Sequence, residues 1–267
     1  MSPSEIRPSR KYRNAVATAP AVRVSPALAL AIAAGAILLP AGAQETTSTT
    51  ATNRIPEVVV TATRSATAPE NTAASVTIIG RDEIEARKIT TLADALQGIP
   101  SMSLVRNGTP GQATSVFTRG TESNHTLLMI DGRRIPANLA GGYDYANLSL
   151  DNIDRIEVVR TGSSSLYGGD AIGGVINLIT RTGRGMEKPE TEFSFEGGSF
   201  NTFRESAASR GASGKFDYSV SASQLNANFP RNNNQYRNSS IRSSFGYELN
   251  EAVYFDLKAS YYQSDGG

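Results

Sequence analysis

Length, composition and charge exclude several classes of protein. The chain has 267 residues and a net charge of +1, with no cysteine and one histidine. The balanced charge argues against a nucleic-acid partner, because such proteins carry a basic patch or stripe. Without cysteine there is no thiol chemistry and no disulfide, and His125 alone cannot form a metal centre. The composition therefore predicts no metal, no cofactor, and a fold held by core packing or by barrel closure.

Residues 1–43 have the layout of a secretory signal peptide. Basic residues come first, an apolar run extends from Ala27 to Leu39, and small residues stand at Ala41 and Ala43. We expect cleavage after Ala43. The alternative is a membrane anchor, although the apolar run is shorter than the roughly 20 residues of a spanning helix.

The next two segments differ sharply in composition. Residues 44–55 are rich in Thr and Ser, which predicts a disordered tether. Residues 56–64 read Pro-Glu-Val-Val-Val-Thr-Ala-Thr-Arg, and the three valines favour an extended backbone. Such a segment could be added as a strand to the sheet edge of another protein. The alternative is the first strand of a folded domain.

Short helices and strands alternate between residues 65 and 185. A strand over 75–79 precedes a helix over 81–86 with an acidic first turn. A second helix begins at Thr91, where Thr91 and Asp94 form a capping box, and stops at Gly98. Further strands are expected over 103–105, 115–118 and 126–130, separated by polar, glycine-containing loops over 107–112 and 136–145.

Residues 152–180 contain two strand patterns joined by a turn. Val158 and Val159 lie in a charged run, 175–179 forms the second strand, and the glycines in 167–170 permit a sharp bend. The turn contains no nucleophile. It is no phosphate loop either, because no Lys-Ser/Thr pair follows and the next element is a strand. Asp131-Gly132 is interpreted as a tight turn rather than a catalytic acid. We therefore expect a protein that is not an enzyme.

The pattern of apolar and polar residues changes after residue 185. Apolar or small residues alternate with polar ones, which is typical of barrel strands with a lipid face and a wet interior. The expected strands are 191–196, 201–210, 216–225, 239–249 and 253–263. A soluble β-sandwich would show similar alternation. Since a small barrel needs about eight strands, the sequence is expected to be a fragment or a truncated gene product.

Several motifs occur together in a recognisable order. Thr118-Arg119-Gly120, Met129-Ile130-Asp131-Gly132-Arg133 and the 152–180 stretch resemble the plug domain of TonB-dependent outer-membrane receptors, nearest to the cobalamin-transporter branch. The resemblance implies an α+β plug domain over 65–185, followed over 186–267 by the first antiparallel strands of a transmembrane β-barrel, incomplete in this chain. It also implies a place in the cell outer membrane, in contact with its lipid, after export through the periplasm.

The resemblance carries implications for particular residues. The TonB box would pair with TonB, which ExbB and ExbD energise; it comprises Glu57, Val58, Val59, Val60, Thr61 and Ala62. The ligand would contact the two polar loops through Asn107, Gly108, Thr109, Gly111, Asn138, Leu139, Tyr143 and Tyr145. Arg119, Arg155 and Arg160 would face the inner barrel wall, although Arg155 could equally pair with nearby carboxylates.

The implied function is TonB-dependent active transport of cobalamin or a ferric siderophore, with the plug gating the barrel. Asn226 to Gln235 offers amides where some cobalamin transporters bind calcium through aspartates, so a calcium site here would be weak. Three alternatives are a signalling receptor, a passive porin or adhesin, and a truncated fragment that does not transport. The signalling receptor is disfavoured because only about a dozen residues separate Ala43 from Pro56, too few for an additional folded domain.

Overall fold

The computed structural model describes residues 75–138, 141–160, 164–229 and 234–266. The expected signal peptide (1–43), tether (44–55) and TonB-pairing segment (56–64) lie outside the described residues, as does Leu139. No helix within the described ranges combines the length and the apolar composition needed to cross a membrane.

A five-stranded mixed sheet organises the first part of the chain. Its order is β1-β6-β7-β4-β5, with β4 and β7 parallel and the other neighbours antiparallel. The strands are β1 (Val76–Gly80), β4 (Thr126–Ile130), β5 (Arg133–Arg134), β6 (Ile153–Val159) and β7 (Gly174–Thr180). The central strands β4 and β7 are nearly continuous apolar runs because both faces of the sheet are covered.

Short helices and a hairpin complete this globular domain. They are α2 (Arg81–Ala86), α3 (Leu92–Leu96), η2 (Ser123–His125), α4 (Ser164–Tyr167), η3 (Gly169–Ala171), and the hairpin of β2 (Met102–Arg106) and β3 (Thr114–Thr118). The N-cap half of the predicted capping box at α3 is confirmed: the Thr91 hydroxyl oxygen accepts from the Asp94 amide, and the hydroxyl donates to the Asp94 carboxylate. Leu92 and Leu96 then enter the core.

The second part of the chain is a long antiparallel sheet in which consecutive strands are neighbours. Its strands are β8 (Glu190–Gly198), β9 (Thr202–Ser213), β10 (Phe216–Asn228), β11 (Gln235–Asn250) and β12 (Val253–Gly266). All five predicted strands are confirmed. Most extend beyond the predicted ends, because ladder pairing continues into polar residues where the alternating pattern is weak.

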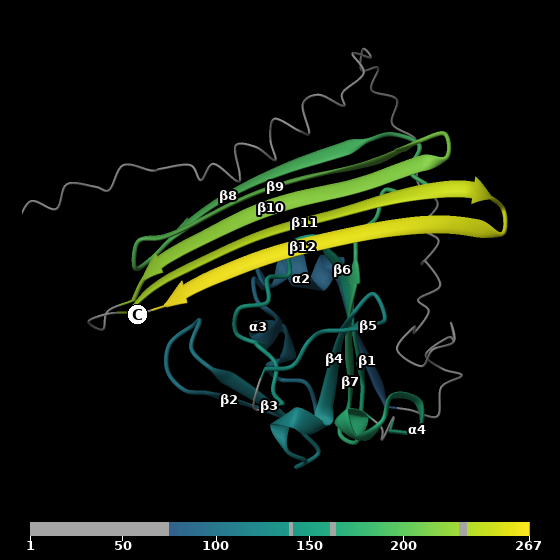
Figure 1. Ribbon diagram of the computed structural model, residues 1–267. Coiled ribbons are helices and arrows are strands. Elements are labelled where there is room, and N and C mark those ends of the chain that lie inside the picture. The colour runs from purple at the N-terminus through teal and green to yellow at the C-terminus, as the bar shows by residue number, and fades with distance from the viewer. Residues whose placement is uncertain (1–74, 139–140, 161–163, 230–233, 267) are drawn as a thin grey trace, which may run out of the picture.

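The long sheet arches across one side of the globular domain, and its strands run roughly across those of the mixed sheet (Figure 1). Its two faces differ. Large apolar side chains such as Phe193, Phe255 and Leu257 point away from the domain and are exposed. Arg242 and Lys258 point toward the domain and bond to it. The alternation predicted from sequence thus separates an apolar outer face from a polar inner face.

The strand pairing predicted within 152–180 is confirmed. β6 and β7 are antiparallel, with Val158 opposite Ile176 and Val159 opposite Val175. The bend between them contains α4 and η3, and Gly168 takes a positive φ of 84° there. The Asp131-Gly132 turn is confirmed too, since both residues have positive φ and join β4 to β5.

Candidate functional site

One segment, residues 147–152, which we call the strip, carries much of the contact between the two parts. Leu148 and Leu150 point into the core, whereas the residues between and beside them point to the long sheet. The strip is fixed from behind by α3, because the Leu92 amide donates to the Leu148 carbonyl at 2.9 Å. Alternation thus places polar residues on the side that faces the sheet.

A cluster of charges lies at one end of this strip. Asp151 forms an ion pair with Arg204 of β9, and its second oxygen accepts from the Ser149 hydroxyl at 2.5 Å. Arg242 of β11 donates to the carbonyls of Asp151 and Ser149, at 2.6 and 2.9 Å. Arg204 also pairs with Glu196 on β8, at 3.1 Å. The globular domain is therefore attached to two strands of the long sheet, β9 through Arg204 and β11 through Arg242, and Glu196 of β8 pairs with Arg204 within the sheet.

The surroundings of Asp151 keep its carboxylate ionised. Burial by itself would raise the pKa, but the charge of Arg204 and the hydrogen bonds from Ser149 and Ser223 outweigh burial and hold the pKa of Asp151 below its usual range. The ion pair is therefore present throughout the neutral range.

A second attachment joins the β4–β5 turn to β12. Lys258 of β12 contacts the Asp131 carboxylate at 2.7 Å. That carboxylate also accepts from the amide and the hydroxyl of Thr180, both at 2.8 Å. Asp131 thus has a role beyond its turn, because it connects the parallel pair β4 and β7 to the long sheet.

The loop over 107–112, which is predicted to contact a ligand, lies beside the first residues of β11. The Thr109 hydroxyl donates to the Asn234 side chain at 2.6 Å. Gly111, with φ of 91°, lies so close to the Tyr236 ring that no Cβ would fit between them. Asn107 and Gly108 are exposed. This loop therefore packs against the long sheet, while its tip at residues 107–108 is exposed.

The second predicted loop, 136–145, has mixed exposure. Asn138 is exposed and closes a turn, in which its amide donates to the Gly142 carbonyl at 2.8 Å and its side-chain oxygen accepts from the Gly142 amide at 3.0 Å. Tyr143 and Tyr145, in contrast, are 9% and 1% exposed. The Tyr145 hydroxyl donates to the Thr126 carbonyl, and the two rings meet edge to face.

The two tyrosines correct the sequence-based expectation. We expected their rings to offer flat area to a ligand, but in this structure they pack in the core, and burial raises the pKa of both hydroxyls. The apolar body of tyrosine suits a core site when the hydroxyl finds a partner. Their composition alone could not distinguish these two uses.

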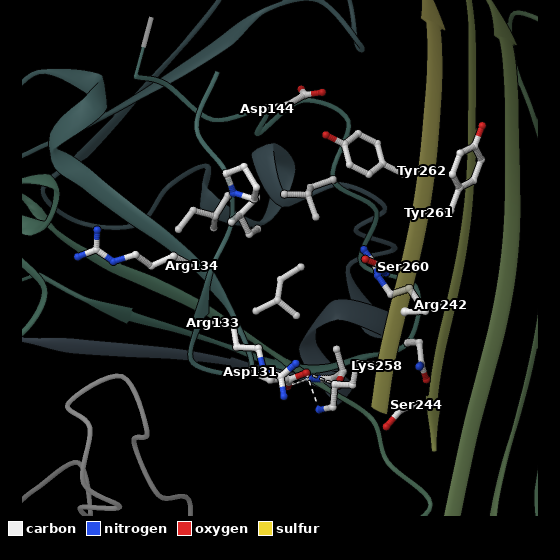
Figure 2. Close-up of a pocket in the computed structure, with 18 of the residues that line it drawn as sticks. Asp131, Arg133, Arg134, Asp144, Arg242, Ser244, Lys258, Ser260, Tyr261 and Tyr262 are labelled. Carbon is white, nitrogen blue, oxygen red and sulfur yellow. Dashed lines mark hydrogen bonds and ion pairs between the residues drawn. The ribbon is translucent and has the colours of Figure 1, made fainter. Parts of the chain in front are cut away.

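A cavity of about 500 Å³ lies between the second loop and β12 (Figure 2). Its apolar lining includes Ile135 and Pro136, and Tyr262 lies on the side of β12 that faces the domain. Arg133, Arg242 and the Asp131–Lys258 pair line the charged part. The cavity thus offers apolar and charged surface together.

Two of the three arginines predicted to face the barrel wall form side-chain bonds within the globular domain. Arg160 is buried and donates to the Pro100 carbonyl and the Ser75 hydroxyl, at 2.6 and 3.0 Å. Arg155 pairs with Glu157 and Asp154, at 2.9 and 3.3 Å, which is the local alternative that the sequence left open. Arg119 is exposed with φ of 54°. Their predicted place against the wall remains a prediction.

Comparison with known proteins decides what the globular domain is. Residues 68–175 match the family described as TonB-dependent Receptor Plug Domain. This part of the chain is a TonB-dependent receptor plug domain. Over 123 residues, or 46% of the chain, the sequence is 42% identical to the vitamin B12 transporter BtuB of Photobacterium profundum. It is 43% identical over 124 residues to the protein of the same name from Vibrio cholerae.

Solved structures extend the similarity past the plug. The ferripyoverdine receptor of Pseudomonas aeruginosa superposes with a TM-score of 0.69 over 78% of this chain and 27% of its own, at 19% identity, which shows the fold. The siderophore receptor PiuA of Acinetobacter baumannii gives a TM-score of 0.60 over 72% of this chain and 27% of its own, at 26% identity. The chain spans about a fifth of the length of the curated relatives it matches. These relatives are described as transporters and receptors.

The chain is thus a plug followed by antiparallel strands, which we call the wall (β8–β12), and within the described residues the wall is an open sheet. Sequence reasoning missed the plug–wall contacts of Asp151, Asp131, Arg204, Arg242 and Lys258. One signal was present: Asn147-Leu148-Ser149-Leu150-Asp151 alternates polar and apolar residues. That pattern predicts an extended strip with one face in the core, but it does not indicate which wall residues meet the other face.

Proposed function

We propose that this chain is the plug and first wall strands of a receptor that imports a large nutrient ligand across the outer membrane with energy delivered by TonB. The observation that carries the proposal is the 42% identity to a vitamin B12 transporter over 123 residues. Cobalamin is therefore the first ligand to test. A ferric siderophore is the second, because the similar folds include siderophore receptors.

The proposed parts follow the order along the chain: signal peptide (1–43), tether (44–55), TonB box (56–64), plug (65–185) and wall (186–267). ExbB and ExbD would energise TonB, and outer-membrane lipid would surround the wall. The chain supplies no reaction chemistry in this scheme. In this scheme the chain binds the ligand, the plug closes the lumen of the barrel, and the plug is displaced when TonB pulls on it.

The contacts around Asp151 and Asp131 support a releasable plug. Each attachment to the wall consists of ion pairs and hydrogen bonds, such as Asp131 to Lys258 at 2.7 Å. Water can replace such bonds once a strand is pulled, whereas an apolar interface would leave exposed surface behind. Ligand binding at the outer loops must favour the state in which the TonB box is accessible, or no signal passes.

The experiment uses the complete gene in cells whose growth requires cyanocobalamin or a single ferric siderophore. Val59→Pro removes a ladder donor from the box and should abolish uptake while ligand binding is retained. Val59→Ile keeps the β-branched side chain and should transport normally. Normal uptake by the proline variant would contradict strand addition at this segment.

The same cells separate the alternatives. Uptake that persists when TonB is deleted would identify a passive porin, and surface attachment without uptake would identify an adhesin. Ligand binding with no uptake in any TonB background would identify a product that does not transport. Growth that requires both TonB and the gene supports the proposal.

A further inference from the structure

Asn147 lies between the two plug loops proposed to bind the ligand and the wall strand β11. It is the first residue of the extended strip and is partly buried. Its hydrogen bonds reach the plug loops on one side and β11 on the other.

On the plug side, the amide nitrogen of Asn147 reaches both loops. Nδ2 lies 3.4 Å from the carbonyl oxygen of Gly111 and 3.0 Å from each carboxylate oxygen of Asp144. The backbone amide of Asn147 also donates to Asp144, at 3.2 Å. One side chain thus links the 107–112 loop to the end of the 136–145 loop.

On the wall side, Asn147 accepts from two residues of β11. The Tyr236 hydroxyl donates to its Oδ1 at 2.8 Å, and the Asn238 side chain donates to its carbonyl oxygen at 2.9 Å. Asn238 also donates to the Tyr236 hydroxyl at 3.1 Å. Both wall residues are buried. The wall therefore holds Asn147 through two bonds, and a third bond joins the two wall residues to each other.

The chemistry of the amide fits this position closely. Asn147 needs a donor toward Asp144 and Gly111 and an acceptor toward Tyr236, and a side-chain amide supplies both on one short stem. Aspartate would place a second carboxylate beside Asp144, and leucine would leave the Tyr236 hydroxyl without its acceptor. Only a neutral side chain with both functions satisfies all partners.

The ring of Tyr236 adds a steric contact to these bonds. It packs on Gly111, which leaves no room for a Cβ. The hydroxyl and ring of one wall residue thus touch the strip and the first loop together. The relative position of the two loops is set by this small set of wall contacts.

We propose that Asn147 is a positioning residue for the ligand site, with Tyr236 and Asn238 as its wall partners. It holds both loops in one arrangement against β11, so that a ligand contacts them together. The role of the loops in binding rests on the proposed function. The positioning itself can be measured without any ligand.

The test uses the full-length receptor with Asn147→Ala, Tyr236→Phe, and the two combined. Tyr236→Phe removes the hydroxyl and keeps the ring on Gly111. Tyr247→Phe is the matched control, because Tyr247 is an exposed wall tyrosine near the opposite end of β11. Hydrogen exchange of the two loops and the affinity for cyanocobalamin and for a ferric siderophore are measured for each protein.

We expect Asn147→Ala to speed exchange in both loops and to weaken ligand binding about fivefold or more, as expected from losing at least one net hydrogen bond. Tyr236→Phe should give a smaller change in the same direction. The double variant should resemble Asn147→Ala rather than the sum, because both changes remove the same bond. Tyr247→Phe should match the wild type.

Exchange that stays at the wild-type rate in either loop of Asn147→Ala would overturn the proposal, as would additive effects of the two changes. Unchanged affinity in a receptor that does bind the ligand would overturn it too. Faster exchange in both loops of a receptor that binds neither probe would support the positioning role and count against the proposed ligands instead.

Discussion

Among single residues, an acidic group of the plug meets basic groups of the wall. The sequence-based expectation for the plug arginines did not include these contacts, in which Asp151 pairs with Arg204 and its carbonyl accepts from Arg242. A planar guanidinium can bond to several oxygens at once, and Arg242 does so with two carbonyls. The Asp151 carboxylate pairs with Arg204 and the Asp151 carbonyl accepts from Arg242, while Leu150 beside them stays in the core.

Replacing Asp151 with asparagine should weaken the attachment of the plug. The side chains of Asp151 and Arg204 are only 12% and 15% exposed, so removing the carboxylate leaves arginine charge poorly compensated. We expect a loss of about 3 kcal/mol in the free energy of unfolding, measured by urea denaturation of the refolded receptor at pH 7.

Asp154→Asn is the control for that variant, because Asp154 is 48% exposed and pairs only on its own strand with Arg155. It should change stability by less than about 0.5 kcal/mol. Equal effects of the two substitutions would show that the Asp151 cluster does not stabilise the plug.

The same carboxylate predicts a dependence on pH. Because the folded pKa of Asp151 lies below its ordinary value of 3.8, its contribution to stability is complete above that value and is lost as the pH falls through the lower, folded pKa. The wild type should therefore lose more stability than Asp151→Asn as the pH falls from about 5 to about 2. This range begins about one unit above the ordinary pKa of an aspartate, which is the usual scatter of such values in proteins. Parallel losses in urea titrations of both proteins would contradict this assignment.

At the scale of elements, α3 and the strip support one another. The helix has five residues, too few to be stable alone, and it depends on its cap and on the strip. The Leu92 amide donates to Leu148, the Leu150 amide donates to the Thr90 carbonyl, and Thr91 pairs with Ser149 as an isolated bridge. The cap therefore helps to fix the backbone from which Asn147 and Asp151 project.

Thr91→Ala should cost about 1 kcal/mol of plug stability, because the Asp94 amide loses its acceptor. Thermal or urea unfolding measures the loss. Thr91→Ser keeps a capping hydroxyl and should remain within a few tenths of a kcal/mol of the wild type. If alanine and serine behaved alike, the cap would have no role in fixing this part of the plug.

At the scale of the whole molecule, the apolar residues are divided between two places. Among the described residues, the main apolar core lies within the plug, from Ile79 to Leu178, and includes no wall residue. The large apolar side chains of the wall, such as Phe255 and Leu257, face away from the plug. The plug–wall contacts named above are mainly hydrogen bonds and ion pairs, together with the Tyr236 ring packed on Gly111. This division suits the release of the plug that we propose.

The outer face of the wall should contact lipid. Leu257→Arg, on that face, should lower the free energy of folding into lipid vesicles by about 2 kcal/mol or more, as a charge within the apolar band does. Asp265→Arg, at the far end of β12, should cost at most about 1 kcal/mol, since charges near the interface are tolerated. Equal costs measured by urea titration would argue against a membrane-embedded face at Leu257.

The helices and strands could be predicted from the sequence, because they follow from local patterns. Alternation predicted the wall strands, the Thr91–Asp94 pair predicted α3, and the glycines after Tyr167 predicted the bend before β7. The order of motifs identified the plug. Each of these signals lies within a few residues, where periodicity and turn chemistry act.

Which side chains meet could be seen only in the folded chain. Asp151 and Arg242, or Asn147 and Tyr236, are separated by about ninety residues of chain, and no local pattern encodes such partners. The position of Tyr145 could not be predicted for the same reason. A tyrosine suits a ligand loop or a core site equally well, and the core site depends on the distant Thr126 carbonyl that accepts from its hydroxyl. Long-range pairing depends on how two sheets pack, and that is a property of the folded chain alone.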